Sequence, residues 1–296
     1  MPARPLEQFA HTPVSRVEAF WDARPCNIRH SRREPGTRAY FDEVERRKYF
    51  VEPHIPGFAQ FDRWKGKKVL EIGCGIGTDT VNFARAGARV TAVDCSARSL
   101  EIARQRAAVY GVNVHFYKAN AEGLSTVVPV ETYDLIYSFG VIHHTPHPDR
   151  VIAEVLRYMG PQSLFKMMVY HRRSWKVLGI LWTCGHGVFW KLDQWIAQHS
   201  EAQSGCPVTY SYTPATVRNL LKGLEVREWF VDHIFPYKVS DYVRYQYVKQ
   251  WYFRCLPAQV FRWMERRWGW HLCVTAALPL SSTDAVCWRP TETEVS

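Results

Sequence analysis

The feature that most constrains the fold is a short apolar segment that leads into three glycines at alternate positions. Val69–Ile72 is apolar apart from Glu71, and Gly73, Gly75 and Gly77 follow it before a helical pattern begins. Glycine adopts positive φ and lets the backbone approach a ligand closely, and a helix N-terminus presents free N–H groups to that ligand. The pattern therefore predicts a strand, a turn and a helix, with a ligand bound at the turn.

Short β-branched segments alternate with helical ones between residues 66 and 170. The predicted strands are Val69–Ile72, Arg89–Val93, Val112–Tyr117, Tyr133–Ser138 and Ser163–Val169. The predicted helices between them are Asp79–Ala86, Ala97–Tyr110 and Asp149–Tyr158. Such alternation is typical of an α/β fold in which helices cover both faces of a parallel sheet.

Polar residues follow the predicted strands, where ligands bind in such sheets. Asp94 ends the second strand, and an acid there can accept hydrogen bonds from both hydroxyls of a ribose. The segment 118–122 follows the third strand and can meet the edge of an adenine. Phe139 and Gly140 follow the fourth strand, just before two histidines.

Together these segments resemble the class I, Rossmann-like methyltransferases that use S-adenosyl-L-methionine, especially the small-molecule branch with the ubiquinone and menaquinone methylation enzymes. The resemblance covers residues 69–170 and, more weakly, the C-terminal part, and it implies a seven-stranded, mostly parallel, doubly wound sheet. It implies that the glycine turn holds the methionine end of the cofactor, Asp94 the ribose and the segment 118–122 the adenine. The cofactor-binding residues that follow are Glu71, Gly73, Cys74, Gly75, Gly77, Asp94, Cys95, Asn120, Ala121, Glu122, Phe139 and Gly140.

Two other interpretations of the glycine turn remain. A tight strand–helix connection needs no ligand, and a dinucleotide-binding fold also opens with glycines. The dinucleotide fingerprint G-x-G-x-x-G is disfavoured, because Gly77 closes the triplet early and Thr78 follows it.

Three histidines at the ends of predicted strands are the candidate catalytic residues. His143 and His144 follow the fourth strand, beside the expected position of the transferable methyl group, and His171 follows the fifth. Each could act as a base or orient the acceptor, and each could instead cap a helix or line the pocket. Arg172 and Arg173 could bind an anionic acceptor or belong to a solvated loop.

The flanks divide the chain into three parts. We expect a helical extension or lid at 1–65, the cofactor core at 66–170, and a C-terminal half at 171–296 that completes the sheet. In the first part we expect helices at Val14–Trp21 and Thr37–Phe50, the second ended by the Pro-Gly segment 53–57. In the third we expect helices at Trp175–Ile196, Thr213–Leu221 and Tyr237–Arg267, and the last two strands at Leu224–Ile234 and Trp270–Ala277. Ten of the twelve tryptophans lie beyond residue 170, and they could form a lid, ordinary core or a surface that rests on a membrane.

Charge and cysteines restrict the partners. The net charge of +10 is confined to the flanks, and no block of five like charges occurs, so a nucleic-acid partner is disfavoured. The eight cysteines show no paired spacing, which predicts no metal site and a reducing, cytoplasmic setting. The start of the chain lacks a signal-peptide pattern, and no sequence feature sets the oligomeric state.

We therefore expect S-adenosyl-L-methionine-dependent methylation of a small organic molecule in specialised or lipid-related biosynthesis. The alternatives are an RNA or protein methyltransferase and a non-catalytic S-adenosyl-L-methionine-binding protein. Enzymes that methylate base amines carry N/D-P-P-Y/F after the fourth strand, where residues 138–141 here are Ser-Phe-Gly-Val.

Overall fold

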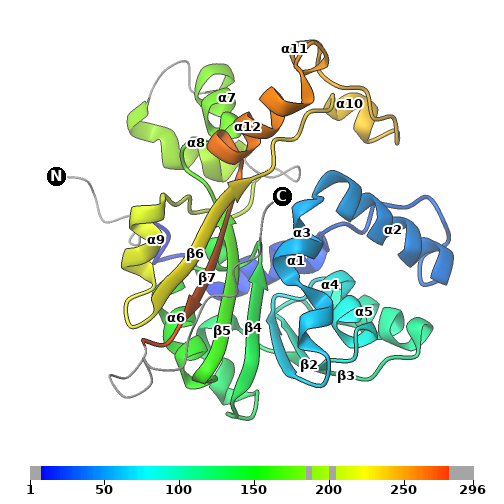
Figure 1. Cartoon of the computed structure of the whole chain (residues 1–296), viewed down its shortest axis with the longest axis vertical. Coiled ribbons are helices and arrows are strands. Elements are labelled where there is room, and N and C mark those ends of the chain that lie inside the picture. The colour runs from blue at the N-terminus through cyan, green and yellow to red at the C-terminus, as the bar shows by residue number, and fades with distance from the viewer. Residues whose placement is uncertain (1–7, 185–188, 200–204, 280–296) are drawn as a thin grey trace, which may run out of the picture.

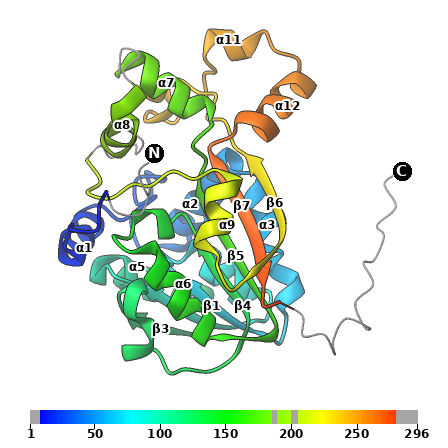
Figure 2. The ribbon, with the colours of Figure 1, turned by 90° about the vertical axis from the view of Figure 1, so that its left-hand side faces the viewer.

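The computed structural model describes residues 8–184, 189–199 and 205–279. Within these residues seven strands form one sheet in the order β3-β2-β1-β4-β5-β7-β6 (Figures 1 and 2). The strands are β1 Lys68–Ile72, β2 Arg89–Asp94, β3 Val114–Lys118, β4 Tyr133–Phe139, β5 Met159–Tyr170, β6 Glu225–Asp232 and β7 His271–Ala277. β7 runs antiparallel to both of its neighbours, and the strands from β3 to β5 are parallel. The predicted α/β class and the mostly parallel seven-stranded sheet are confirmed.

The helices between the strands cover both faces of the sheet. They are α4 Thr78–Arg85, α5 Ala97–Tyr110, α6 Pro148–Arg157 and α9 Pro214–Leu220, with short 3-10 helices η2 Ala121–Thr126 and η3 Ile142–His144. Capping residues in the sequence determine where several of these helices begin. The Ser96 hydroxyl accepts a hydrogen bond from the N–H of Ser99 at the start of α5, and Thr213 caps α9 in the same way.

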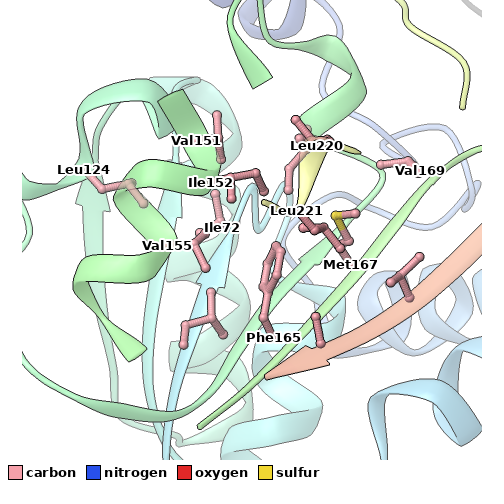
Figure 3. Packing of buried hydrophobic residues seen from close by; sticks show 14 of the residues in the cluster. Ile72, Leu124, Val151, Ile152, Val155, Phe165, Met167, Val169, Leu220 and Leu221 are labelled. Carbon is pink, nitrogen blue, oxygen red and sulfur yellow. The ribbon is translucent and has the colours of Figure 1, made fainter. Parts of the chain in front are cut away.

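Alternate side chains of the central strands enter two separate cores, as strand geometry requires. On β1, Leu70 and Ile72 point to the face covered by α6 and α9, whereas Val69 points to the face covered by α3–α5. Figure 3 shows the first core, in which Ile72 and Phe165 meet residues of α6 such as Ile152. Burial on both faces explains why these strands are almost continuously apolar.

The N-terminal extension consists of α1 Val14–Ala23, α2 Arg38–Val51, α3 His54–Ala59 and η1 Phe61–Trp64. The Pro-Gly segment 53–57 was expected only to end the preceding helix, but α3 begins within it. Pro56 is the third residue of α3, where no intrahelical partner exists for its missing N–H, so the first turn tolerates it.

The C-terminal insertions lie at the end of the sheet to which β6 points (Figures 1 and 2). They are α7 Trp175–Thr183, η4 Phe189–Lys191, α8 Leu192–His199, α10 Val239–Tyr242, α11 Trp251–Arg254 and α12 Ala258–Trp268. The single helical segment expected at Tyr237–Arg267 is therefore three short helices. Tyr245 has φ of 66° and Pro257 precedes α12, and both interrupt a continuous helix. Across the described ranges, none of the helices has the length and apolar character needed to cross a membrane.

Candidate cofactor and acceptor site

The turn after β1 is shaped by glycines at positive φ. Gly73 has φ of 79°, and a Cβ built there would lie 2.1 Å from Cγ2 of Val141. The N–H groups of Gly73 and Cys74 both donate to the carbonyl of Val93, which ties the turn to the end of β2. Only glycine fits this conformation and this close approach.

Asp94 lies beside the turn and its carboxylate is buried. One oxygen accepts a hydrogen bond of 2.8 Å from the N–H of Gly75, and the other accepts one of 2.8 Å from Ser96. Burial raises the pKa of Asp94, and these N–H donors counteract the rise. The backbone and side chain of Cys95 also form hydrogen bonds with this carboxylate, and Asp94 lines the cavity that opens from the turn.

A cavity of about 360 Å³ opens from this turn, within the range of small-ligand sites. Most of the predicted cofactor and catalytic residues line it. Those that do are Glu71, Gly73, Cys74, Gly75, Asp94, Cys95, Asn120, Ala121, Phe139, Gly140 and His144. The carboxyl ends of β1 and β4 therefore meet at one site, as the resemblance implies.

Four predicted residues lie outside the cavity lining. Gly77 packs against α5, where an added Cβ would lie 3.0 Å from Cβ of Ala103. The carboxylate of Glu122 accepts a hydrogen bond of 2.8 Å from the N–H of His147, at the start of α6. The other two are histidines.

His143 is fully buried and stacks against Tyr170, with ring centroids 3.7 Å apart. Neither ring nitrogen has a hydrogen-bond partner among the described residues. Burial, with the nearby His144 and Lys176, holds the pKa of His143 well below its usual range. His171 is also buried, and its Nδ1 lies 3.1 Å from the carbonyl of Gly269. Both side chains are therefore buried outside the cavity lining.

His144 faces the cavity with a defined tautomer. Its Nδ1 lies 2.8 Å from the carbonyl oxygen of Val208, which can only accept, so Nδ1 carries the proton. Nε2 of the neutral ring therefore holds the lone pair. Trp21 of α1 packs edge-on against this ring, with centroids 5.1 Å apart. Of the three predicted histidines, His144 alone lines the cavity.

Beneath the glycine turn lies a buried network of acids that the sequence did not reveal. The Asp79 carboxylate accepts hydrogen bonds from Lys48 (2.7 Å), Tyr49 (2.9 Å) and Tyr137 (3.2 Å). Burial and the nearby Asp79 raise the pKa of Glu71 to about 8. Lys48 belongs to α2, so the N-terminal extension supplies a buried cation to the cofactor core.

Sequence reasoning also missed the far end of the cavity. The N-terminal extension contributes Trp21 and Glu52, and the C-terminal half contributes Lys176, His233, Trp270 and His271. None of these residues belongs to a motif. The single available signal was that His271 opens the predicted last strand, at the edge of the sheet where ligands bind.

Comparison with known proteins defines the class. Residues 69–162 match a family described as a methyltransferase domain. The ubiquinone biosynthesis O-methyltransferase of Haemophilus ducreyi is 33% identical over 110 residues, which are 36% of this chain and 47% of that protein. The Pseudomonas fluorescens protein of the same name is 35% identical over 96 residues, which are 32% of this chain and 41% of that protein. The chain thus spans about half the length of the curated relatives it matches.

Solved structures agree on the fold. The magnesium protoporphyrin IX methyltransferase of Synechocystis superposes with a TM-score of 0.56 at 15% identity, covering 90% of this chain and all of that one. The YcgJ protein of Bacillus subtilis gives 0.53 at 13% identity, covering 78% of this chain and all of its own. Residues 69–162 therefore match a methyltransferase domain, and the fold is that of the class I S-adenosyl-L-methionine-dependent methyltransferases. Within that class the domain resembles those of ubiquinone-type methyltransferases.

Proposed function

We propose that the protein transfers a methyl group from S-adenosyl-L-methionine to an oxygen of a small organic acceptor, in specialised or lipid-related biosynthesis. The observation that carries the proposal is a cavity whose lining combines the glycine turn and Asp94 with three histidines, His144, His233 and His271. The relatives named as O-methyltransferases support an oxygen acceptor.

The bound cofactor would supply an electrophilic methyl group on its sulfonium. The chain's contribution is to hold the acceptor in line with that methyl group, which lowers the entropic cost of an in-line displacement. Nε2 of His144 is the group that would accept the proton of an acceptor hydroxyl. Trp21 and Trp270, which also line the cavity, would exclude water from the reacting atoms.

Exposed tryptophans at the same end of the fold support contact with a membrane surface. The exposed fractions are 81% for Trp182, 72% for Trp190 and 73% for Trp251. Arg254 and Lys191 are exposed next to them in the sequence. Aromatic and basic side chains together favour an anionic lipid interface. Sedimentation with anionic vesicles should decrease when Trp182 and Trp251 are replaced by serine, and unchanged sedimentation would refute this contact.

The test of the main proposal is methyl transfer itself. Purified protein is incubated with cofactor labelled in the methyl group and with polyprenyl catechols, simple phenols, amines, RNA and protein acceptors. We expect label on a hydroxylated small molecule, and loss of that label in Asp94→Ala. Transfer to RNA or protein alone would refute the proposal, as would tight cofactor binding without transfer to any acceptor.

A further inference from the structure

Two histidines and a glutamate from three distant segments converge at the acceptor end of the cavity. Glu52 follows α2, His233 follows β6 and His271 opens β7. One ligand atom from each lies within 4.8 Å of the other two. The Nε2 atom of His271 is 3.6 Å from the Glu52 carboxylate, and the rings of His233 and His271 are stacked with centroids 4.5 Å apart.

A second layer of side chains orients His271 toward Glu52. Nδ1 of His271 forms a hydrogen bond of 3.0 Å with Nε2 of His54, so Nε2 of His271 is the nitrogen left to coordinate. Nδ1 of His54 is buried, has no hydrogen-bond partner among the described residues, and lies 3.9 Å from Asp232. Histidine ligands of metals are commonly backed by a further group that ends in a carboxylate.

The charged side chains around the cluster favour the binding of a cation. Lys48 is paired with Asp79 at 2.7 Å, and Arg262 is paired with Asp232 and Glu265. Lys176 faces the cluster as well and lies 4.8 Å from the centroid of the Trp270 ring. The carboxylates of Glu52, Asp79, Asp232 and Glu265 thus outnumber the three cations near the site.

We propose that Glu52, His233 and His271 bind a first-row divalent cation, with Zn²⁺ preferred. Two imidazoles and a carboxylate leave at least one coordination position open, as in catalytic zinc sites. Tetrahedral bonds of about 2.1 Å put two ligand atoms about 3.4 Å apart. The 3.6 Å between His271 and Glu52 fits this geometry, and the other spacings, which reach at most 4.8 Å, would shorten by roughly 1 Å on binding.

The role of the cation rests on the proposed function. An acceptor hydroxyl at the open position loses its proton to Nε2 of His144, because a bound divalent cation lowers the pKa of an oxygen ligand. The oxygen then forms a bond with the methyl carbon as the carbon–sulfur bond breaks. The sulfonium becomes a neutral thioether and the cation keeps its oxidation state, so no oxidant or reductant is needed.

Metal binding is measured first, without cofactor or acceptor. Protein freed of metal by a chelator is titrated with Zn²⁺ by calorimetry, and with Co²⁺ by visible absorption. We expect one equivalent per chain, and at least tenfold weaker binding in Glu52→Gln and His233→Ala. His115→Ala, which removes an exposed histidine on β3, is the matched control and should bind as the wild type does. Circular dichroism and thermal melts verify that each variant is folded.

The outcomes separate this proposal from the proposed function. Binding that is absent, or equally strong in Glu52→Gln and the control, would overturn the metal site whether or not methyl transfer occurs. Methyl transfer that continues undiminished in the metal-free protein would overturn the catalytic role of the cation. A tight, Glu52-dependent site in a protein that methylates nothing would uphold the metal site and refute the proposed function alone.

Discussion

The buried ion pair between α2 and α4 allows the sharpest test of how the N-terminal extension is attached to the core. Nζ of Lys48 lies 2.7 Å from Asp79, and the two side chains are only 12% and 2% exposed. Burial lowers the pKa of Lys48, but the carboxylates of Asp79 and Glu52 outweigh that effect and the pKa ends above its ordinary value. Lys48→Met would leave Asp79 charged and buried. Such a loss costs about 3–5 kcal/mol, and the hydroxyls of Tyr49 and Tyr137 that remain on Asp79 place the expected cost near the lower end.

The free energy of unfolding is measured by urea denaturation for Lys48→Met, Asp79→Asn and the double variant. We expect a loss of about 3 kcal/mol for Lys48→Met and a coupling energy of about 2 kcal/mol in the cycle, because the double variant no longer buries an unpaired charge. Lys67→Met is the control, since Lys67 pairs with Asp134 at 3.5 Å while 56% exposed and should cost less than about 1 kcal/mol. Equal losses of unfolding free energy in Lys48→Met and Lys67→Met would refute the conclusion that the buried ion pair attaches the N-terminal extension to the core.

Five further variants test the site and the surrounding fold. Gly73→Ala should cost about 2–5 kcal/mol of stability in a urea melt, since it adds backbone strain and a steric clash; a loss below 1 kcal/mol would contradict the turn geometry. Asp94→Ala should weaken S-adenosyl-L-methionine binding by about 1–3 kcal/mol in calorimetry, and unchanged affinity would mean that the ribose binds elsewhere. His144→Gln should lower kcat about 10²–10⁴-fold with the cofactor affinity retained, whereas His143→Gln should lower stability and change kcat little; the reverse pattern would exclude His144 as the base. Burial and nearby cations lower the pKa of His30 to about 3. As pH falls below 6.5, the His30 side chain is therefore protonated in the unfolded chain before it is protonated in the folded one, which lowers the free energy of unfolding. His30→Asn removes this effect and should reduce the loss of stability between pH 7.5 and 5 by about 1–2 kcal/mol.

The sequence predicted the central strands and the glycine turn well because local rules govern them. Apolar strands, the glycines before α4 and Asp94 after β2 each have a meaning that depends only on neighbouring residues. The positive φ of Gly73 and the hydrogen bonds to Asp94 are what those rules require. Glu122 shows the limit of such rules, since its place after β3 suggested adenine and its carboxylate instead holds the N–H of His147.

The acceptor half could not be predicted because tertiary packing decides it. Glu52 and His271 are separated by most of the chain, and nothing local to either residue indicates that they meet. His143 and His144 are adjacent in sequence, but η3 turns one ring into the core and the other toward the cavity. The insertion at 237–267 was expected to be helical, and its tyrosine-rich pattern did not reveal the break at the left-handed Tyr245.

The antiparallel pair of strands β6 and β7 has a consequence for how proteins with this fold can diversify. It carries His233 and His271 to the cavity, whereas the glycine turn and Asp94 come from β1 and β2 on the other side of the sheet. The glycine turn and these two histidines thus lie in separate stretches of the chain, although Glu52 and His144 in the same lining come from segments before β5. Exchange of the segment beyond β5 between relatives should therefore change one part of the cavity lining while the glycine turn and Asp94 are kept.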